Sequence, residues 1–344
     1  MRIDSLCKLG LLLWMFFLPN IMCGQHRLFR VMTYNVENLF DTCHDVGYDD
    51  REFLPTAQRK WDSRRYWKKQ GQLSRTIAAA SGAMPIDIVG LCEVENDSVI
   101  RDLTQRTRLH RMGYQYVVTH SQDARGVDVA LLYQPEHFKL LHHESVRIPV
   151  SSQYGRPTRD ILYAVGRLPN GDSLDIFVNH WPSRRGGSRL ADDYRFLVAK
   201  VLRDFADSLL SVRAHPCLIL MGDFNDEYTN RSIKKGLGAF SPDASTTSDY
   251  VVLSAGLKGA DGIAGTYKFR GIWNQLDQII VSRSLLDSES RLRTSPGKCR
   301  ILSFPFLLEA DESRGGVKPY RTYLGPVYQG GVSDHLPLIL ELEW

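Results

Sequence analysis

Residues 218–225 read Leu-Ile-Leu-Met-Gly-Asp-Phe-Asn, an apolar run that ends directly in an acid and an amide. A short apolar run of this kind predicts a buried strand, with Asp223 and Asn225 at its end. Polar residues at strand ends are common because they form turns, so one such end carries little weight alone. The same transition recurs along the chain, however, and the repetition is hard to attribute to turns.

Four further stretches pass from an apolar strand to a polar end. The polar residues are Asn35 after residues 28–34, Glu93 after residues 86–91, His180 after residues 173–179, and Asp334 with His335 in residues 331–337. These side chains are rich in oxygen, and no two cysteines have the spacing of a zinc site. The set favours a hard cation, Mg²⁺ first and Mn²⁺ or Ca²⁺ as alternatives, over structural zinc.

The same residue types indicate a chemistry. A magnesium ion takes one or two carboxylates and keeps several waters, so the remaining acids can orient water and histidine. A histidine that donates to phosphate is held in its tautomer and charge by an acid behind it. Metal and imidazolium then stabilise the charge at phosphorus while an Asp and an Asn position the attacking water. The set therefore predicts hydrolysis of a phosphoester.

In chain order, these motifs resemble those of the endonuclease/exonuclease/phosphatase superfamily. That group includes pancreatic-type deoxyribonucleases, abasic-site endonucleases, neutral sphingomyelinases and inositol polyphosphate 5-phosphatases. The resemblance covers residues 28–344 and implies a four-layer α/β sandwich, with two mixed sheets face to face and helices outside. The motifs are Tyr34-Asn35-Val36-Glu37-Asn38, Glu93, Asn179-His180, Gly222-Asp223-Phe224-Asn225, Leu276-Asp277-Gln278 and Ser333-Asp334-His335.

The resemblance implies a metal site and two phosphate-contacting histidines. Glu93 resembles the principal metal-binding acid, with Asn35 beside it and Asp334 supporting the metal or the neighbouring histidine. His180 and His335 resemble the histidines at the scissile phosphate, one of them able to protonate the leaving oxygen.

Further acids are assigned in the same way. Asp223 and Asn225 resemble the pair that orients or deprotonates water and holds the phosphate. Asp277 matches the acid that assists the histidine and metal arrangement. Asp128 falls where the deoxyribonuclease branch pairs an acid with the first histidine, so we expect it to pair with His180; a turn-forming role is the alternative.

Three other features have both a functional and a structural interpretation. Arg184 and Arg185, just after His180, either clamp phosphate or form a solvated turn. Basic and aromatic residues interleave in residues 59–69, as on a nucleic-acid surface or on the solvated face of a helix. The long aromatic stretch 302–331 is expected to form a wall or lid beside the site, or a flap packed on its own aromatics.

Apolar periodicity outlines the elements of one predicted catalytic domain, residues 25–344. The expected helices are residues 64–80, 99–112 and 189–210. The expected strands are residues 28–34, 86–91, 116–119, 128–133, 161–168, 173–179, 216–221, 278–281 and 338–343.

Residues 1–24 have the pattern of a signal peptide, with a basic start, an apolar stretch and a polar exit. The apolar stretch is too short to span a bilayer as a helix, so we expect an exported protein, periplasmic or extracellular, without a stable membrane span. Cys23 could accept a lipid, but no small residue precedes it directly, which favours cleavage over anchoring. Free, buried cysteine is the favoured interpretation of Cys92 and Cys217.

Composition leaves the substrate open. The chain is 43% hydrophobic and 24% charged, as in ordinary globular proteins, and 43 basic against 39 acidic residues give a net charge of only +4. This charge does not by itself require a polyanion. We therefore expect a secreted nucleic-acid phosphodiesterase first, a phosphoesterase of lipid or small-molecule headgroups second, and a noncatalytic binding protein third. The oligomeric state is not indicated.

Overall fold

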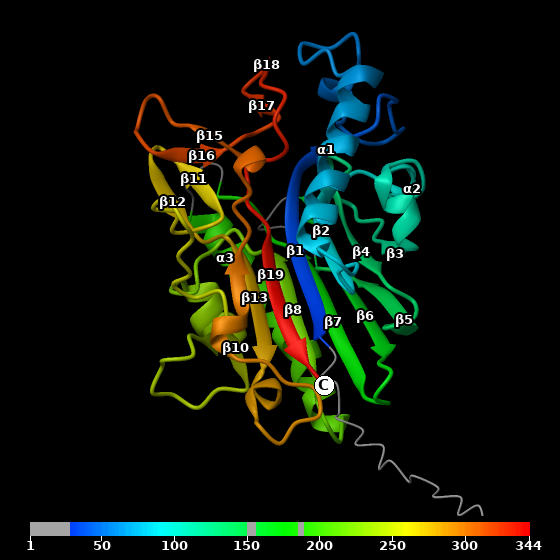
Figure 1. The fold of residues 1–344 in the computed structure, drawn as a ribbon. Coiled ribbons are helices and arrows are strands. Elements are labelled where there is room, and N and C mark those ends of the chain that lie inside the picture. The colour runs from blue at the N-terminus through cyan, green and yellow to red at the C-terminus, as the bar shows by residue number, and fades with distance from the viewer. Residues whose placement is uncertain (1–27, 150–155, 185–188) are drawn as a thin grey trace, which may run out of the picture.

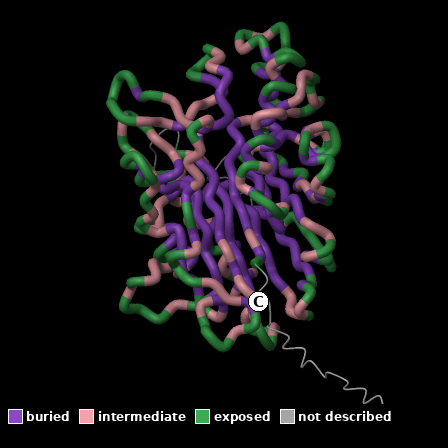
Figure 2. The backbone as a smooth tube through the Cα atoms, viewed as in Figure 1, coloured by how far each residue is buried: buried purple, intermediate pink, exposed green. Residues whose placement is uncertain are grey.

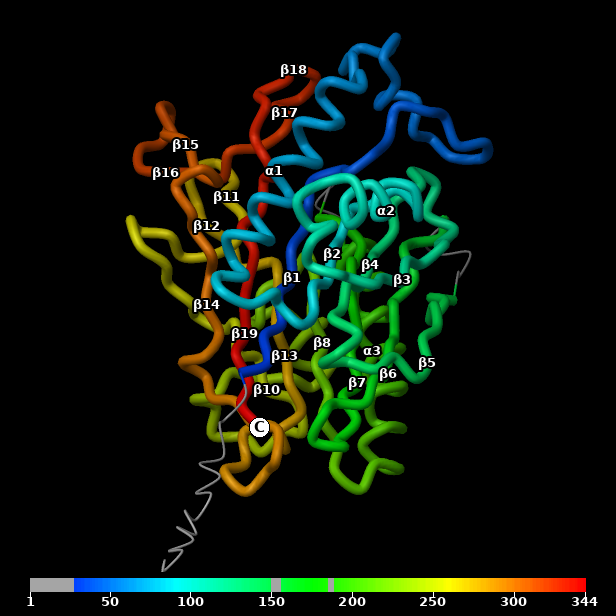
Figure 3. Tube along the Cα trace, turned by 45° about the vertical axis from the view of Figure 1, so that its right-hand side comes forward, coloured from blue at the N-terminus to red at the C-terminus, as the bar shows by residue number. Residues whose placement is uncertain are grey.

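Two mixed β-sheets pack face to face and form the interior of the computed structural model, which describes residues 28–149, 156–184 and 189–344 (Figure 1). The first sheet has the strand order β14-β19-β1-β2-β4-β3 and the second β5-β6-β7-β8-β13-β10-β9. Helices α1 and α2 lie on the first sheet, and Figure 3 shows α1 across its outer face. Helix α3 packs on the second sheet. This confirms the predicted four-layer sandwich.

The bounds of the elements follow the chain. The first sheet comprises β1 (Leu28–Leu39), β2 (Ile88–Val94), β3 (Gln115–Val118), β4 (Asp128–Tyr133), β14 (Cys299–Ile301) and β19 (Leu338–Glu343). The second comprises β5 (Lys139–Val146), β6 (Ile161–Arg167), β7 (Ser173–His180), β8 (Leu218–Asp223), β9 (Ala239–Phe240), β10 (Tyr250–Val252) and β13 (Asp277–Ser282). The helices are α1 (Ser63–Ser81), α2 (Asp97–Gln105) and α3 (Arg189–Val212).

Shorter elements complete the fold. Three hairpins stand apart from the sheets: β11 (Tyr267–Phe269) with β12 (Ile272–Asn274), β15 (Leu308–Ala310) with β16 (Val317–Pro319), and β17 (Tyr323–Leu324) with β18 (Val327–Tyr328). Single helical turns lie at Arg51–Phe53, Arg108–Met112, Ser232–Leu237, Arg283–Leu286, Pro296–Lys298 and Pro305–Leu307. No helix within the described ranges is long and apolar enough to cross a membrane.

Strand β8 shows why its sequence is apolar without alternation. Ile219 and Met221 belong to the core between the two sheets. Leu218 and Leu220 point the other way and belong to the core beneath α3. Successive side chains of a strand face opposite sides, so a strand buried on both faces must be apolar at every position. Figure 2 shows the same burial throughout the central strands.

The prediction differs from the structure in one helix and in strands that are short or exposed. The predicted helix 99–112 is divided into α2 and the turn Arg108–Met112, because the Thr107 side chain accepts from Leu109 N and starts a new turn. Strand β5 was not predicted. It is an edge strand, paired with β6 alone and mostly exposed, so it lacks the apolar alternation that marks the other strands.

The basic and aromatic stretch 59–69 is largely structural. Trp61 and Tyr66 are buried, and Lys69 is buried on α1. Lys69 Nζ donates to Glu37 O at 2.7 Å, to Thr322 Oγ1 at 2.5 Å and to Val332 O at 3.1 Å. One buried ammonium therefore ties α1 to β1 and to the segment before β19.

The aromatic stretch 302–331 packs against the same helix. The guanidinium of Arg65 lies 4.4 Å from the ring centroid of Tyr328, and that of Arg75 lies 4.0 Å from that of Phe306. Tyr323 is buried and makes an edge contact with Tyr328. The segment thus forms a flap packed on its own aromatics and on α1.

Gly222, at the end of β8, has φ +132°, and an ideal Cβ there would lie 1.9 Å from Asn179 O of the neighbouring strand. We expect Gly222→Ala to lower the free energy of unfolding by more than about 4 kcal/mol, since both backbone strain and a clash with main-chain atoms oppose it. Gly171→Ala is the matched control. It has φ +89° with open space around it, so it should cost about 1–3 kcal/mol. Urea unfolding of the two variants measures the difference, and equal losses would contradict the close approach of β7 and β8.

Candidate active site

The polar strand ends meet at one end of the sandwich. There they line a cavity of about 440 Å³. Of the residues predicted from sequence, those on its surface are Glu93, His180, Arg184, Asp223, Asn225, Asp334 and His335. Strand β8 brings Asp223 beside His180 of the parallel strand β7, and beside Asp277 of the antiparallel strand β13.

Several of these side chains are held by unusual backbone geometry. Asn38, Glu93 and Asn225 have φ between 51° and 65°, a region that residues other than glycine seldom occupy. At Glu93 the pairing of β2 with β4 shifts register between Cys92 and Val94, which is a β-bulge. The bulge places the Glu93 side chain on the cavity instead of in the core.

The carboxylate of Asp223 is the hub of the site. Its Oδ2 accepts from Asn35 Nδ2 at 3.0 Å and from Asn225 Nδ2 at 3.4 Å, and its Oδ1 accepts from Asn225 N at 2.8 Å. The Nε2 atoms of His180 and His335 lie 3.8 and 3.9 Å from Oδ2. Burial raises the pKa of Asp223 to about 7, although His335 opposes the shift. A carboxylate with such a pKa can take a proton from water near neutral pH.

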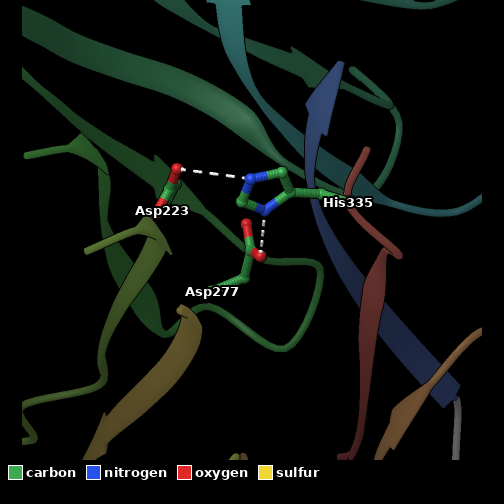
Figure 4. A group of neighbouring side chains, drawn as sticks. All are labelled: Asp223, Asp277 and His335. Carbon is green, nitrogen blue, oxygen red and sulfur yellow. Dashed lines mark hydrogen bonds and ion pairs between the residues drawn. The ribbon is translucent and has the colours of Figure 1, made fainter. Parts of the chain in front are cut away.

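His335 is supported by Asp277 (Figure 4). The distance from His335 Nδ1 to Asp277 Oδ2 is 2.7 Å, and Thr266 Oγ1 donates to the same oxygen at 2.5 Å. Burial alone would lower the pKa of His335, but Asp277, Asp223 and Asp334 together raise it well above the ordinary value. The ring is therefore an imidazolium whose Nε2 faces Asp223.

His180 has the opposite surroundings. Its Nε2 lies 3.8 Å from Glu93 Oε1, while its buried Nδ1 has no hydrogen-bond partner among the described residues. Burial, and then the nearby cations Arg159 and Arg125, lower the pKa of His180 well below the ordinary value. The surroundings of the two histidines thus shift their pKa values in opposite directions.

The predicted pairing of Asp128 with His180 is wrong. Asp128 Oδ1 accepts from Thr119 Oγ1 at 2.6 Å and from Ser121 N at 2.8 Å, which closes residues 119–128 into a fixed loop. The turn-forming alternative is the one found, because local donors at the start of β4 satisfy the carboxylate first.

Glu93 and Asn35, both predicted to bind the metal, differ in their surroundings. Glu93 Oε2 accepts from Asn38 N at 2.8 Å, and the residue lines the cavity. Asn35 turns its amide nitrogen to Glu93 Oε1 at 3.4 Å, while its Oδ1 accepts from Glu37 N at 2.9 Å. Asn35 therefore orients the carboxylates of Glu93 and Asp223 through its amide nitrogen. Asp334 lines the cavity but is held by Arg321.

A second group of possible ligands adjoins the first. Asp223, Asp277 and His335 each offer one ligand atom, all within 4.8 Å of one another. An ion bound there would compete with the hydrogen bond between His335 and Asp277. Glu93 lies 3.8 Å from the nearest histidine nitrogen and makes no such short bond to a ring, so it is the carboxylate that we expect to hold a divalent ion.

The two predicted phosphate-binding arginines have different outcomes. Arg184 lines the cavity, but its Nε donates to Asn225 O at 2.7 Å and its Nη2 to Asn230 Oδ1 at 3.0 Å. It therefore holds the loop of Asn225 in place. Arg185 lies outside the described residues, as do residues 1–24 with Cys23.

Sequence reasoning missed an aromatic wall and one cation. The wall comes from β11–β12, not from the stretch 302–331: Tyr267 packs on His335 with ring centroids 4.9 Å apart, and Phe269 is parallel to Tyr267 within 12°. The cation is Arg125, which lies beside His180 on the loop closed by Asp128. Neither stretch has strong periodicity, and only the turn-forming alternative for Asp128 pointed to that loop.

Comparison with known proteins places the chain in a family. The pattern of the endonuclease/exonuclease/phosphatase family matches residues 30–344, so the chain belongs to that family. Together with the structural likenesses below, this makes it a phosphoester hydrolase, and enzymes of the family are generally dependent on a divalent metal. No curated protein sequence matches the chain.

Solved structures share the fold at low identity. A mannosyl-6-phosphatase of Bacteroides thetaiotaomicron is 15% identical, with 92% of this chain and 100% of that chain covered and a TM-score of 0.58. A family protein from the same organism is also 15% identical, covering 93% and 96%, with a TM-score of 0.57. The D. rerio protein TDP2, in complex with a single-stranded DNA product, is 14% identical, covering 92% and 98%, with a TM-score of 0.54.

The pair of His335 and Asp277 predicts a pH effect. Removing the Asp277 charge in Asp277→Asn lowers the pKa of His335, so the ring loses its proton at a lower pH than in the wild type. We expect activity at neutral pH to fall about a hundredfold and the alkaline limb of the rate profile to move to lower pH. NMR titration of the His335 ring checks the shift, and an unchanged His335 pKa would refute the coupling.

Glu93 is tested through the metal. In Glu93→Gln the amide keeps the shape but loses the charge that attracts a divalent ion, so half-maximal activity should require at least about tenfold more Mg²⁺. Titration of activity and calorimetric Mn²⁺ binding measure the change. The exposed Glu144→Gln on β5 is the control, and identical Mg²⁺ titrations for both variants would remove Glu93 from the metal site.

Proposed function

We propose that this protein is an exported, Mg²⁺-dependent phosphodiesterase that hydrolyses nucleic-acid phosphodiester bonds by attack of water. The observation that carries the proposal is the position of Asp223 between two histidines, of which only His335 is backed by an acid, beside an aromatic wall. The wall offers a flat face beside His335, where a base or sugar next to the scissile phosphate can stack. Export rests on the pattern of residues 1–24.

Each side chain has a distinct part in this reaction. Asp223, with a pKa of about 7, takes a proton from the attacking water, and Asn225 fixes the direction of that carboxylate. His335, kept protonated by Asp277, donates from Nε2 to the phosphate and supplies the proton for the leaving oxygen. His180 donates as a neutral ring from the other side. A divalent ion held at Glu93 would offset the negative charge of the phosphate.

A small phosphoester is the second candidate substrate. The cavity, about 440 Å³, falls in the range of pockets that enclose one small ligand. The structural likeness to a mannosyl-6-phosphatase supports the same alternative. A sugar phosphate could use the aromatic wall in place of a nucleoside, since the stacking face suits either ring.

Nicking of supercoiled plasmid tests the first candidate. The purified chain 25–344 should convert plasmid to open circles with Mg²⁺ and not with EDTA. His335→Ala and Asp223→Ala should each lower the rate at least about a hundredfold, the scale of a lost acid or base. His143→Ala is the control, since His143 is exposed on β5, away from the cavity.

The alternative outcome is also decisive. If the folded wild type does not nick plasmid but releases phosphate from mannose 6-phosphate, the small phosphoester replaces nucleic acid as the substrate. If His335→Ala nicks as fast as the wild type, the activity comes from a contaminant or His335 has no part in it.

A further inference from the structure

Arg125 is a cation on the surface of the cavity, and it has no part in the reaction proposed above. It lies on the loop of residues 119–128, between β3 and β4, and lines the cavity together with His180. Its Nε lies 3.4 Å from Asp123 Oδ1, and its side chain is 39% exposed. Neither terminal guanidinium nitrogen has a hydrogen-bond partner in the described part of the chain. The guanidinium therefore has donors to spare on the side of the cavity.

The loop that carries Arg125 is rigid. Asp123 Oδ1 accepts from Arg125 N at 3.0 Å, and Gly126 N donates to Asp123 O at 3.0 Å, which makes a tight turn. Gly126 has φ +68°, and an ideal Cβ there would lie 3.0 Å from the ring of Tyr48. Asp128 closes the base of the loop through Thr119 and Ser121. A loop with this many fixed points can hold a side chain in one place.

A buried arginine sets the distance between this loop and β7. Arg159 Nη1 donates to Asp123 Oδ2 at 3.1 Å, and its Nε donates to His180 O at 3.1 Å. Its remaining nitrogen donates to Trp181 O. Asp123 thus joins two arginines, Arg159 in the core and Arg125 at the cavity, and Arg125 keeps a fixed relation to the end of β7.

The two sides of the cavity differ in the charged groups beside their histidines. On the opposite side His335 is backed by Asp277 and is protonated. His180 has no acid on Nδ1, because Asp128 bonds elsewhere. Arg184, another described cation on the cavity, uses its Nε and Nη2 on the loop of Asn225 and keeps only Nη1 for a ligand. Among the described residues, Arg125 is therefore the cationic side chain beside His180 with two terminal nitrogens left for a phosphate oxygen.

We propose that Arg125 binds a non-bridging oxygen of the scissile phosphate, beside His180, and that Asp123 and Arg159 hold it in position. A guanidinium can present two parallel N–H groups to one phosphate, which gives direction as well as charge. The proposal rests on the phosphoester hydrolysis proposed above but is independent of the group attached to the phosphate.

Binding of inorganic phosphate by calorimetry tests the proposal without turnover. Arg125→Ala should weaken phosphate binding about tenfold to a hundredfold, the loss of one hydrogen bond to a charged group. Arg125→Lys should recover part of it, since an ammonium keeps the charge but not the paired donors. Arg101→Ala, on the exposed face of α2, is the matched control and should bind phosphate like the wild type. Circular dichroism confirms that each variant is folded.

Kinetics with bis-p-nitrophenyl phosphate add a second readout. In Arg125→Ala, kcat/KM should fall by a similar factor, and millimolar guanidinium should restore part of the loss. Unchanged phosphate binding in Arg125→Ala, or no phosphate binding by the wild type, would overturn the proposal. If phosphate binding depends on Arg125 while the wild type cleaves no phosphoester, the proposed function fails and the role of Arg125 in phosphate binding stands.

Discussion

The carboxylate of Asp223 joins the polar ends of the two sheets into one site. It belongs to β8 of the second sheet, and Asn35 of β1 donates to it from the first. Asp223 is buried apart from its side on the cavity, so the partners around it must satisfy the oxygens that the protein covers. The close approach of Gly222 to Asn179 serves the same end, because it fixes how far β8 lies from β7. The core packed beneath these strands therefore keeps the Asp223 carboxylate in position.

The difference between the two histidines gives the site a direction. Asp277 makes His335 a proton donor, whereas His180 lies near two arginines and without an acid on Nδ1. A phosphate between them meets a charged ring on one side and a neutral ring on the other. The leaving oxygen is best placed toward the charged ring, which is also where Tyr267 and the aromatic wall lie. Charge and shape therefore agree on the orientation of the substrate.

Much of this arrangement could be predicted from the sequence, and the exceptions share a cause. Strand β8 and its polar end could be predicted because an apolar run followed by polar residues is a local signal in the sequence. The same holds for β1, β2, β7 and β19. The partner of Asp128 could not be predicted, since Thr119 and His180 compete for it and only three-dimensional distance decides. The orientation of the Asn35 amide could not be predicted either. Its oxygen accepts from the backbone N–H of Glu37, which turns its nitrogen to Glu93. Arg125 and Tyr267 lie on a loop and a short hairpin, where sequence has little periodicity to interpret.

The pairing of β1 with β19 has a consequence for folding. The ladder joins Leu28 to Glu343, and β19 lies between β14 and β1 inside the first sheet. Contacts between such distant residues form slowly, because a long loop must close before any stabilisation is gained. Asp334 and His335 precede β19 directly, so they reach Asp277 only after that closure. Assembly of the site therefore depends on contact between the two ends of the domain, and the return of activity on refolding would report that long-range step.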